Sequence, residues 1–130
     1  MKVIDATGST LGRLATYSAK NALKGEEIRV LNCDKIIITG NKKDLVEKYK
    51  QKRRLVGSTQ KGPKYSRDIE SVVKTTIRGM LPNYRRGRGR VAYKKIKCYI
   101  GVPSEFENAK IEIFGQRQVK KAQVLGDVVK

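Results

Sequence analysis

An arginine-rich segment at residues 84–90, Tyr-Arg-Arg-Gly-Arg-Gly-Arg, carries the side chains with the most specific chemistry in this chain. A guanidinium group presents a planar set of donors that can bind two oxygens of one phosphate. Gly87 and Gly89 lack side chains, so the backbone there is predicted to lie close against a ribose-phosphate strand. Tyr84 and Tyr65 each offer a ring on which an unpaired base can stack, the alternative being partial burial with the hydroxyl in water. No helix-turn-helix, zinc-finger or RRM pattern accompanies them, so we expect recognition of backbone and shape.

The charge of the chain is concentrated in two stretches. Thirty Lys and Arg residues face twelve Asp and Glu, for a net charge of +18. Residues 48–67 contain eight cations and residues 71–104 contain nine, and neither stretch contains an acid. A solvated helix face ordinarily mixes both signs, whereas a surface that faces phosphates does not. The predicted RNA-binding residues are Arg13, Lys50, Lys52, Arg53, Arg54, Lys61, Lys64, Arg67, Arg78, Tyr84, Arg85, Arg86, Arg88, Arg90, Lys94 and Lys95.

Two aspartates, Asp5 and Asp34, raise the possibility of an enzyme. Each follows a predicted strand, where α/β enzymes hold metal-binding carboxylates, and a pair of them could support a magnesium-dependent nuclease. Aspartate at the end of a strand is more often a turn residue that accepts hydrogen bonds from nearby backbone amides. No third acid lies near either one in the sequence. The turn role is therefore favoured, and we expect no catalytic residue and no metal, with the nuclease as the alternative.

The glycine-containing loop before the first helix is not a nucleotide-binding loop. A Walker loop needs four residues between its glycines, then Lys and Ser or Thr. Here three residues separate Gly8 from Gly12, and Arg13 and Leu14 follow. We therefore expect a capped turn and no cofactor, with the free amides of the helix and Arg13 available to an RNA phosphate. The chain also has no His and no Cys-x-x-Cys pair, which removes the commonest zinc sites and His-based catalysis.

An α/β fold must position these residues. Residues 2–4 read as a strand, and a helix capped by Ser9 or Thr10 follows, with apolar positions at helical spacing up to Leu23 and a left-handed cap at Gly25. Residues 27–33 and 35–40 read as further extended segments. A strand, a helix and a strand at this spacing predict a βαβ unit with a parallel sheet. Cys33 and Cys98 lie among apolar residues and are interpreted as buried thiols.

The second half of the chain is predicted less completely. Asn41 caps a short helix, and residues 50–65 are interpreted as a long basic loop or an irregular hairpin. Ser66 is predicted to cap a helix with Met80 on its apolar face, and residues 89–96 and 97–101 follow as helical turns and a strand. Residues 107–130 form an uncertain tail of one domain spanning 1–130. No apolar run approaches a membrane span and no signal-peptide core is present, so the chain is expected to stay where it is made.

Four motifs occur in an order and at spacings that resemble a known family: IDATGSTLGRLA, NCDKIIITGNK, TIRGMLPN, and GR followed by KKIKCYIGVP. The chain resembles the L-thirteen family of large-subunit ribosomal proteins in its archaeal form, over about residues 2–106. GMLP at residues 79–82, followed by the basic run, is the most specific of these motifs. The resemblance implies a three-layer α/β/α sandwich with a mostly parallel four-stranded sheet and basic loop extensions.

The resemblance also implies a function. Family members are structural constituents of the large subunit that bind its rRNA, support early assembly and catalyse no reaction. We therefore expect large-subunit rRNA and neighbouring ribosomal proteins as partners, in the cytoplasm, with no membrane and no small-molecule substrate. The alternative is a free RNA-binding translational regulator. Met80 and Leu81 are implied to anchor a helix end, and residues 50–65 to reach into RNA. The implied RNA-facing residues are Arg78, Arg85, Arg86, Arg88, Arg90, Lys94 and Lys95.

Overall fold

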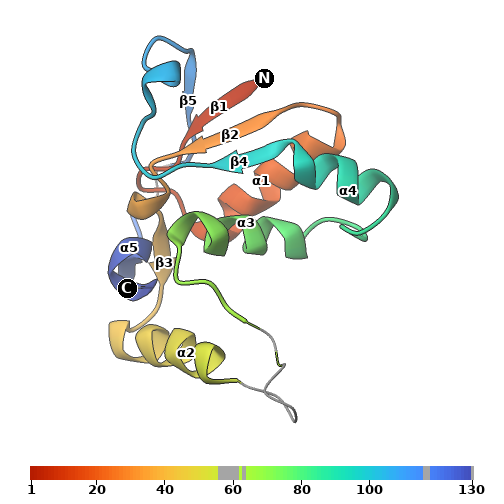
Figure 1. Cartoon of the computed structure of the whole chain (residues 1–130). Helices are drawn as coiled ribbons and strands as arrows, with labels where there is room; N and C mark the ends of the chain where they lie inside the picture. Colours follow the sequence, from red (N-terminus) through yellow and green to blue (C-terminus); the bar gives the residue numbers. More distant parts are fainter. Residues whose placement is uncertain (56–61, 63, 116–117, 130) are drawn as a thin grey trace.

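The computed structural model describes residues 1–55, 62, 64–115 and 118–129, and its centre is a parallel sheet. The strands are β1 (Lys2–Asp5), β2 (Ile28–Leu31), β4 (Ile96–Cys98) and β5 (Ile111–Ile113). They lie in the order β4-β2-β1-β5, and every neighbouring pair is parallel (Figure 1). The parallel pairing of β1 with β2 through the intervening helix confirms the predicted βαβ unit.

Helices cover the sheet. One face is packed beneath α1 (Leu11–Leu23), α3 (Ile69–Gly79) and α4 (Gly87–Lys94) (Figure 1). Successive side chains of a strand point to opposite faces, so Ile4 packs under these helices while Val3 packs on the other side against Phe106. Phe106 belongs to the 3-10 helix η2 (Ser104–Phe106). The predicted α/β/α sandwich is confirmed. In the described part of the chain, no helix is both long enough and apolar enough to cross a membrane.

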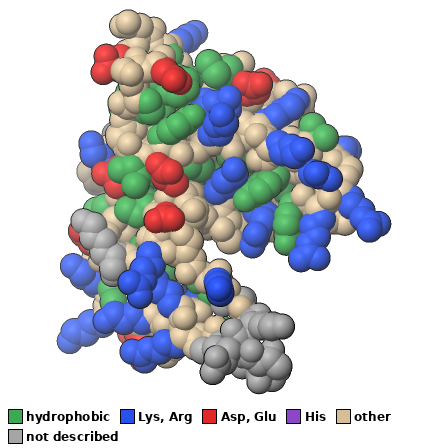
Figure 2. All heavy atoms as spheres, in the orientation of Figure 1, with side chains coloured by type: hydrophobic (Ala, Val, Ile, Leu, Met, Phe, Trp, Pro, Cys, Tyr) green, Lys and Arg blue, Asp and Glu red, His purple; other side chains and the backbone are tan. Residues whose placement is uncertain are grey.

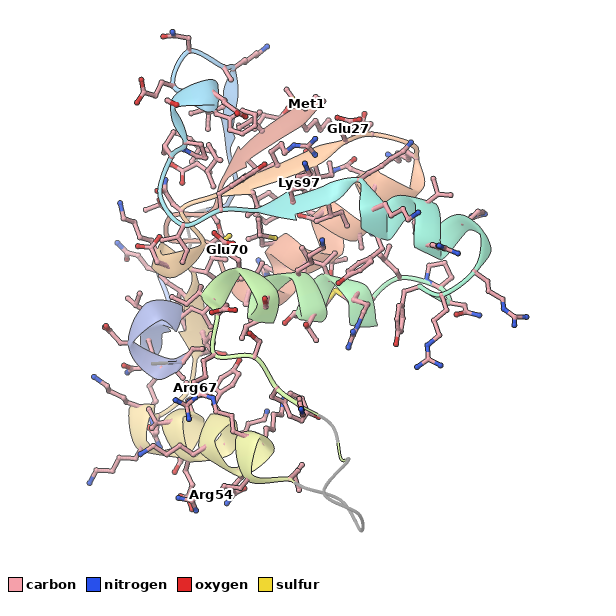
Figure 3. The ribbon with its side chains drawn as sticks, viewed as in Figure 1. Met1, Glu27, Arg54, Arg67, Glu70 and Lys97 are labelled. Atoms are coloured by element: carbon pink, nitrogen blue, oxygen red, sulfur yellow. The ribbon has the colours of Figure 1, made fainter. Side chains whose placement is uncertain are left out.

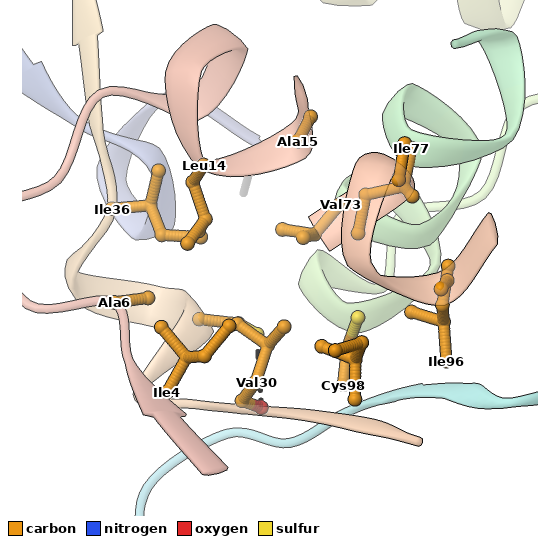
Figure 4. Close-up of a cluster of buried hydrophobic side chains, with 14 of the residues drawn as sticks. Ile4, Ala6, Leu14, Ala15, Val30, Ile36, Val73, Ile77, Ile96 and Cys98 are labelled. Atoms are coloured by element: carbon orange, nitrogen blue, oxygen red, sulfur yellow. Dashed lines mark hydrogen bonds between the residues drawn. The ribbon is translucent and has the colours of Figure 1, made fainter. Parts of the chain in front are cut away.

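The main core lies between the sheet and α1 and α3 (Figure 4). Ile4, Leu14 and Ile77 have no exposed surface. Cys33 and Cys98 belong to the same cluster and are free thiols, which confirms their interpretation as small buried residues. The neighbouring Cys98 thiol and burial both raise the pKa of Cys33, so this thiol stays protonated and unreactive.

The end of α1 shows how closely the local sequence determines the backbone. Gly25 has a φ of +99°, in the left-handed region that favours glycine. Its amide donates to the carbonyl of Ala22 (3.0 Å), and the amide of Glu26 donates to the carbonyl of Asn21 (3.3 Å). This pair of bonds is a Schellman motif, and it turns the chain back toward β2 as the glycine predicts.

The extended segment after β2 is not part of the main sheet. The chain leaves β2 through the 3-10 helix η1 (Cys33–Lys35) and forms β3 (Ile37–Thr39). β3 pairs antiparallel with β6 (Ala122–Val124) in a separate two-stranded sheet. The fourth strand of the main sheet is instead β5, from the part of the chain for which the sequence predicts no clear structure.

The C-terminal segment completes the core. It provides β5, β6 and the short helix α5 (Leu125–Val129). Leu125 and Val129 are completely buried, and the amide of Leu125 donates to the carbonyl of Ile36 (2.7 Å). α5 packs against η1 and against α2 (Lys42–Arg54), which lies at the bottom of Figure 1. Elements of three to five residues are too short to show a helical or alternating period, so the sequence pattern does not reveal them.

Both ends of α3 differ from the prediction. Asp68 is the N-cap rather than Ser66, whose hydroxyl instead bonds the Asp68 carboxylate (3.1 Å). At the other end Leu81 is buried as the resemblance implies. Met80 is 42% exposed, so it does not anchor the helix end by burial; its sulfur instead accepts a hydrogen bond from the Thr16 hydroxyl of α1 (3.3 Å). Met80 is the C-cap, where the backbone leaves the helix and the apolar period no longer points inward.

Candidate nucleic-acid interface

The arginine-rich segment folds into a turn and the first half of α4. The amide of Arg85 donates to the side-chain oxygen of Asn83 (3.2 Å), and the amide of Arg86 donates to the Asn83 carbonyl (3.3 Å). Asparagine is favoured in turns because its side chain can hold such an amide. Arg86 is the N-cap of α4, so Arg88 and Arg90 are helical rather than part of a loop. All four arginines are exposed, which leaves their guanidinium groups available to a ligand.

Gly89 allows close packing within the chain, whereas the sequence predicts that it allows close approach of RNA. The residue is buried, and a Cβ atom placed on it would lie 1.9 Å from the carbonyl oxygen of Pro82 and 2.6 Å from that of Asn83. α4 therefore sits directly on the turn that precedes it. The prediction that Gly89 lets RNA approach the backbone is wrong, because the chain itself occupies that space. Gly87 is exposed with a φ of +64° and nothing near its Cβ position, and its approach to RNA stays a prediction.

Tyr84 organises two cations of this corner. The guanidinium carbons of Arg78 and Arg85 lie 4.7 Å and 5.5 Å from the centre of its ring. Arg85 Nε also donates to the Tyr84 hydroxyl (3.2 Å), and this hydrogen bond and the positive charge of Arg85 lower the pKa of Tyr84. Cation–π contacts of this kind hold an arginine in place without neutralising its charge. The ring of Tyr84 thus already contacts two guanidinium groups, and its stacking on a base stays a prediction.

A neighbouring aromatic pair extends the same arrangement and is not predicted from the sequence. The ring centres of Tyr84 and Tyr93 are 6.2 Å apart, and Lys74 Nζ lies 4.9 Å from the centre of the Tyr93 ring. The spacing of Lys74 and Arg78, four residues apart on one helix, was the available signal. Lys95 is held differently, since its ammonium donates to the Gly25 carbonyl at the end of α1 (2.9 Å). We call the following set the α4 surface: Lys74, Arg78, Tyr84, Arg85, Arg86, Arg88, Arg90, Lys94 and Lys95.

A second basic group lies on α2. The helix runs to Arg54, so the predicted loop over residues 50–65 is wrong in its first part, where Lys50, Lys52 and Arg53 are helical. Lysine, glutamine and arginine are good helix formers, and cations in a last turn interact favourably with the negative end of the helix dipole. Arg53 Nη2 donates to the carbonyl of Val129, which ties α2 to α5.

The chain returns toward α3 through residues 64–68, where Lys64 and Arg67 are exposed. In Figure 3, Arg54 lies on the outer side of α2, and Arg67 lies on the side that faces the rest of the molecule. Lys61 falls outside the described residues. We call the described set the α2 surface: Lys50, Lys52, Arg53, Arg54, Lys64 and Arg67.

The two surfaces share an electrostatic property. Figure 2 shows Lys and Arg side chains over α4 and over α2, while most of the Asp and Glu side chains lie on the opposite side, toward β5 and η1. Within the described ranges the salt bridges are Lys2–Glu26 and Arg29–Glu27, both at 3.2 Å. Neither includes a residue of the α4 or α2 surface. Within the described ranges the cations of both surfaces are therefore free of salt bridges, although Glu47 lines a hollow on α2 together with Lys50 and Arg54.

Arg13 stands apart from both surfaces. It is exposed on the first turn of α1 and, with Lys20, Tyr17 and Phe114, borders a shallow hollow of about 390 Å³. Among the described residues that line this hollow, none belongs to the α2 or α4 surface. A contact between Arg13 and RNA would therefore be independent of the contacts made by the α2 and α4 surfaces.

Asp5 is a turn residue. Its Oδ1 accepts hydrogen bonds from the amide of Thr7 (3.0 Å), the hydroxyl of Thr7 (2.7 Å) and the side-chain amide of Asn32 (3.0 Å). Partial burial raises the pKa of Asp5, but the hydrogen bonds from Asn32 and Thr7 and the charge of Lys35 outweigh burial, so the pKa lies below its ordinary value. The carboxylate thus fixes the end of β1 against the end of β2.

This shift predicts an acid-sensitive contribution to stability. A carboxyl group whose pKa is lowered by folding stabilises the native state above its unfolded pKa of about 3.9. That contribution disappears as the pH falls through the lower folded pKa. We expect Asp5→Asn to flatten the dependence of the free energy of unfolding on pH between about pH 5 and pH 2, as measured by urea unfolding. Glu105→Gln, which removes an exposed carboxylate elsewhere, should leave the dependence unchanged. Equal slopes for Asp5→Asn and the native chain would contradict the assignment.

Asp34 has a different setting. It lies in η1, and the backbone of α5 approaches it closely, since a Cβ placed on Gly126 would lie 3.1 Å from the Asp34 carbonyl oxygen. Among the described residues, no group of three or more His, Cys, Asp or Glu side chains is placed so that it could hold a metal ion. The hydrogen bonds of Asp5 are those of a turn residue. Asp34 Oδ1 is instead buried without a hydrogen-bond partner among the described residues, so this oxygen does not make the bonds that a turn role predicts.

Comparisons with known proteins agree with the geometry. The family model described as Ribosomal protein L13 matches residues 1–105, which include both basic surfaces. The chain is similar to the large ribosomal subunit protein uL13 of Methanosphaera stadtmanae, with 42% identity over 134 residues that cover 98% of this chain and 94% of that protein. The protein of the same name from Methanococcus maripaludis is 49% identical over 106 residues, covering 79% and 77%. That from Methanococcoides burtonii is 38% identical over 133 residues, covering 98% and 94%.

Proposed function

This chain belongs to the ribosomal protein L13 family, and on that premise we propose that it binds large-subunit rRNA and supports early assembly of the large ribosomal subunit. The relatives are named as proteins of the large ribosomal subunit, which supports a structural role in the ribosome. The proposed partners are large-subunit rRNA and neighbouring proteins of that subunit, in the cytoplasm. The proposal includes no catalytic step, in keeping with a family of structural proteins.

The observation that carries this proposal is that, in the described chain, no cation of the α4 or α2 surface forms a salt bridge with an acid. Exposed cations without counter-charges bind phosphates and release the ions condensed around them, which supplies much of the affinity of proteins for nucleic acids. The arginines of the α4 surface add planar donor sets that match phosphate oxygens. A neutral or basic partner would leave this charge repelling itself.

The fold supports a mechanism for this proposed role. The α4 surface is held by the packing of α4 on its own preceding turn, and the α2 surface is tied to the core through α5. The cations allow negatively charged RNA segments to approach one another, and the rigid α/β body sets their relative orientation. Binding is expected to depend on the shape of the RNA and on its backbone rather than on a base sequence.

A double substitution on the α4 surface tests the proposal. Arg85→Gln with Arg86→Gln removes two exposed guanidinium groups and is expected to weaken binding to large-subunit rRNA. The slope of log K against log salt should become shallower by nearly two units, because each phosphate contact contributes roughly 0.7–0.9. Filter binding between 50 and 200 mM salt, a range over which such contacts are strongly attenuated, measures both quantities.

The matched control removes the same charge elsewhere. Lys24→Gln with Lys110→Gln takes two exposed lysines from outside both surfaces and should leave the slope nearly unchanged. An equal effect of the two double variants would mean that only net charge matters and would reject the assigned surface. Sedimentation of a cell extract separates a ribosomal component, which travels with the large subunit, from a free regulator. Incubating RNA with the protein and magnesium, with Asp5→Asn as control, tests the nuclease alternative.

A further inference from the structure

A cleft separates α2 from α3, beside the α2 surface. Its volume is about 280 Å³, at the lower limit of small-ligand sites, which span about 300–1,000 Å³. α2 contains no buried residue, and the cleft between it and α3 is open to solvent on one side. Figure 2 shows the surface indented between the α2 part and the α4 part of the molecule, and Figure 3 shows side chains of α2 and of residues 64–68 facing this region. The space suits one small planar group rather than a double helix.

Two tyrosine rings and one lysine form the centre of the cleft. Lys52 Nζ lies 5.6 Å from the centre of the Tyr49 ring and 5.8 Å from the centre of the Tyr65 ring. Tyr65 is 42% exposed, and Tyr49 is half-buried, which raises the pKa of its hydroxyl. A ring face beside an ammonium group can stack on a nucleobase while the ammonium binds the attached phosphate.

The other residues that line the cleft are also suited to binding a nucleotide. Arg53, Lys64 and Arg78 add positive charge, and four Ser or Thr residues add hydroxyl groups. Among the described residues that line the cleft, none is Asp or Glu. The ring of Tyr65 also differs from that of Tyr84, which two guanidinium groups already cover. The cleft thus offers aromatic and cationic groups together, and Tyr65 is the more accessible of the two predicted stacking residues.

We propose that this cleft holds one unstacked nucleotide of an RNA strand, with its base on Tyr65 and its phosphate on Lys52 and Lys64. The inference rests on the proposed RNA-binding function and adds a defined site to it. A free nucleotide and a nucleotide within an RNA strand offer the same base and phosphate to the cleft. The strand is favoured because the cleft opens beside the cations of the α2 surface, which can bind the phosphates of neighbouring nucleotides. The cleft therefore selects RNA with an unpaired residue, and the α4 surface binds backbone without this requirement.

The chain contains no tryptophan, so a single tryptophan reports on the cleft directly. Tyr65→Trp is expected to lose fluorescence when a mixed-sequence single-stranded RNA of ten nucleotides is added, because the indole stacks on a base. A ten-base-pair RNA duplex should quench it much less at equal occupancy. Tyr84→Trp is the matched control, and quenching by the single strand should be weaker there. Equal quenching at both positions, or by both RNAs, overturns the proposal.

A second measurement gives the affinity. Tyr65→Ala should weaken binding of the single strand by about 5- to 150-fold, the range for loss of one base–aromatic contact, whereas Tyr65→Phe should retain it. Adenosine 5′-monophosphate should compete only weakly. Competition as strong as that of the RNA would make the cleft a free-nucleotide site and overturn the proposal.

The two proposals fail in different ways. If Tyr65→Ala binds the single strand as the native chain does while the Arg85 and Arg86 variant still changes the salt slope, only the cleft assignment is rejected. If the native chain binds neither RNA, both proposals are rejected.

Discussion

Gly89→Ala is expected to lower the free energy of unfolding by about 3 kcal/mol, at the upper end of the range for an overpacked core position. Alanine is ordinarily the better residue in a helix by up to about 1 kcal/mol, so propensity alone predicts the opposite sign. The steric effect should dominate because the atoms that the new methyl group meets, the carbonyl oxygens of Pro82 and Asn83, belong to the backbone. Urea unfolding followed by circular dichroism measures the change.

Gly79→Ala is the control for this substitution. Gly79 is the last residue of α3, and a Cβ placed on it meets nothing within 4 Å. We expect a change within about 0.5 kcal/mol, or a small gain in stability. A similar loss in both variants would show that the contact between α4 and its preceding turn is not tight, and with it that Arg88 and Arg90 are not held as described.

Leu125→Ala is expected to lower the free energy of unfolding by about 3 kcal/mol, within the range of 2–5 kcal/mol for truncation of a buried leucine. Leu125 is completely buried in the main cluster and begins α5, the helix against which α2 packs. The substitution therefore leaves a cavity where the C-terminal segment joins the core. Thermal and urea unfolding of the purified chain measure the loss.

The adjacent residue provides the control. Val124 is 41% exposed at the end of β6, and Val124→Ala removes a comparable apolar group from the surface. We expect that variant to lose no more than about 1 kcal/mol. Equal losses at the two neighbours would mean that Leu125 does not belong to the core, and α2 would then lack its support.

Elements long enough to show a complete hydrophobic period were predictable from the sequence. α1 spans 13 residues with apolar positions at helical spacing, and Gly25 ends it, so sequence and structure agree there almost residue by residue. The sequence predicts a loop where α2 in fact continues to Arg54. The last five residues of α2 are all basic or polar, so they show no apolar stripe that would indicate a helix. β5, β6 and α5 are three to five residues long, and their existence depends on partners elsewhere in the chain.

For the candidate site, residue types were predictable and roles within the fold were not. The run of arginines predicts a phosphate-binding surface whatever its conformation. Gly89 is an example. A glycine in the sequence indicates close approach of a neighbour, but it does not indicate whether that neighbour is RNA or the chain's own backbone. Tyr65 and Tyr84 likewise have identical chemistry, and only their neighbours distinguish an accessible ring from one covered by two guanidinium groups.

The position of β5 beside β1 has a consequence for how the chain matures during its own synthesis. Val3 in β1 lies opposite Ile111 in β5, so one edge of β1 stays unpaired until β5 has been synthesised. At translation rates of 5–20 residues per second that delay is about 5–20 s, during which a hydrogen-bonding edge is available to other nascent chains. The net charge of +18 keeps such chains apart, so the same cations protect the newborn protein from aggregation before any RNA is bound.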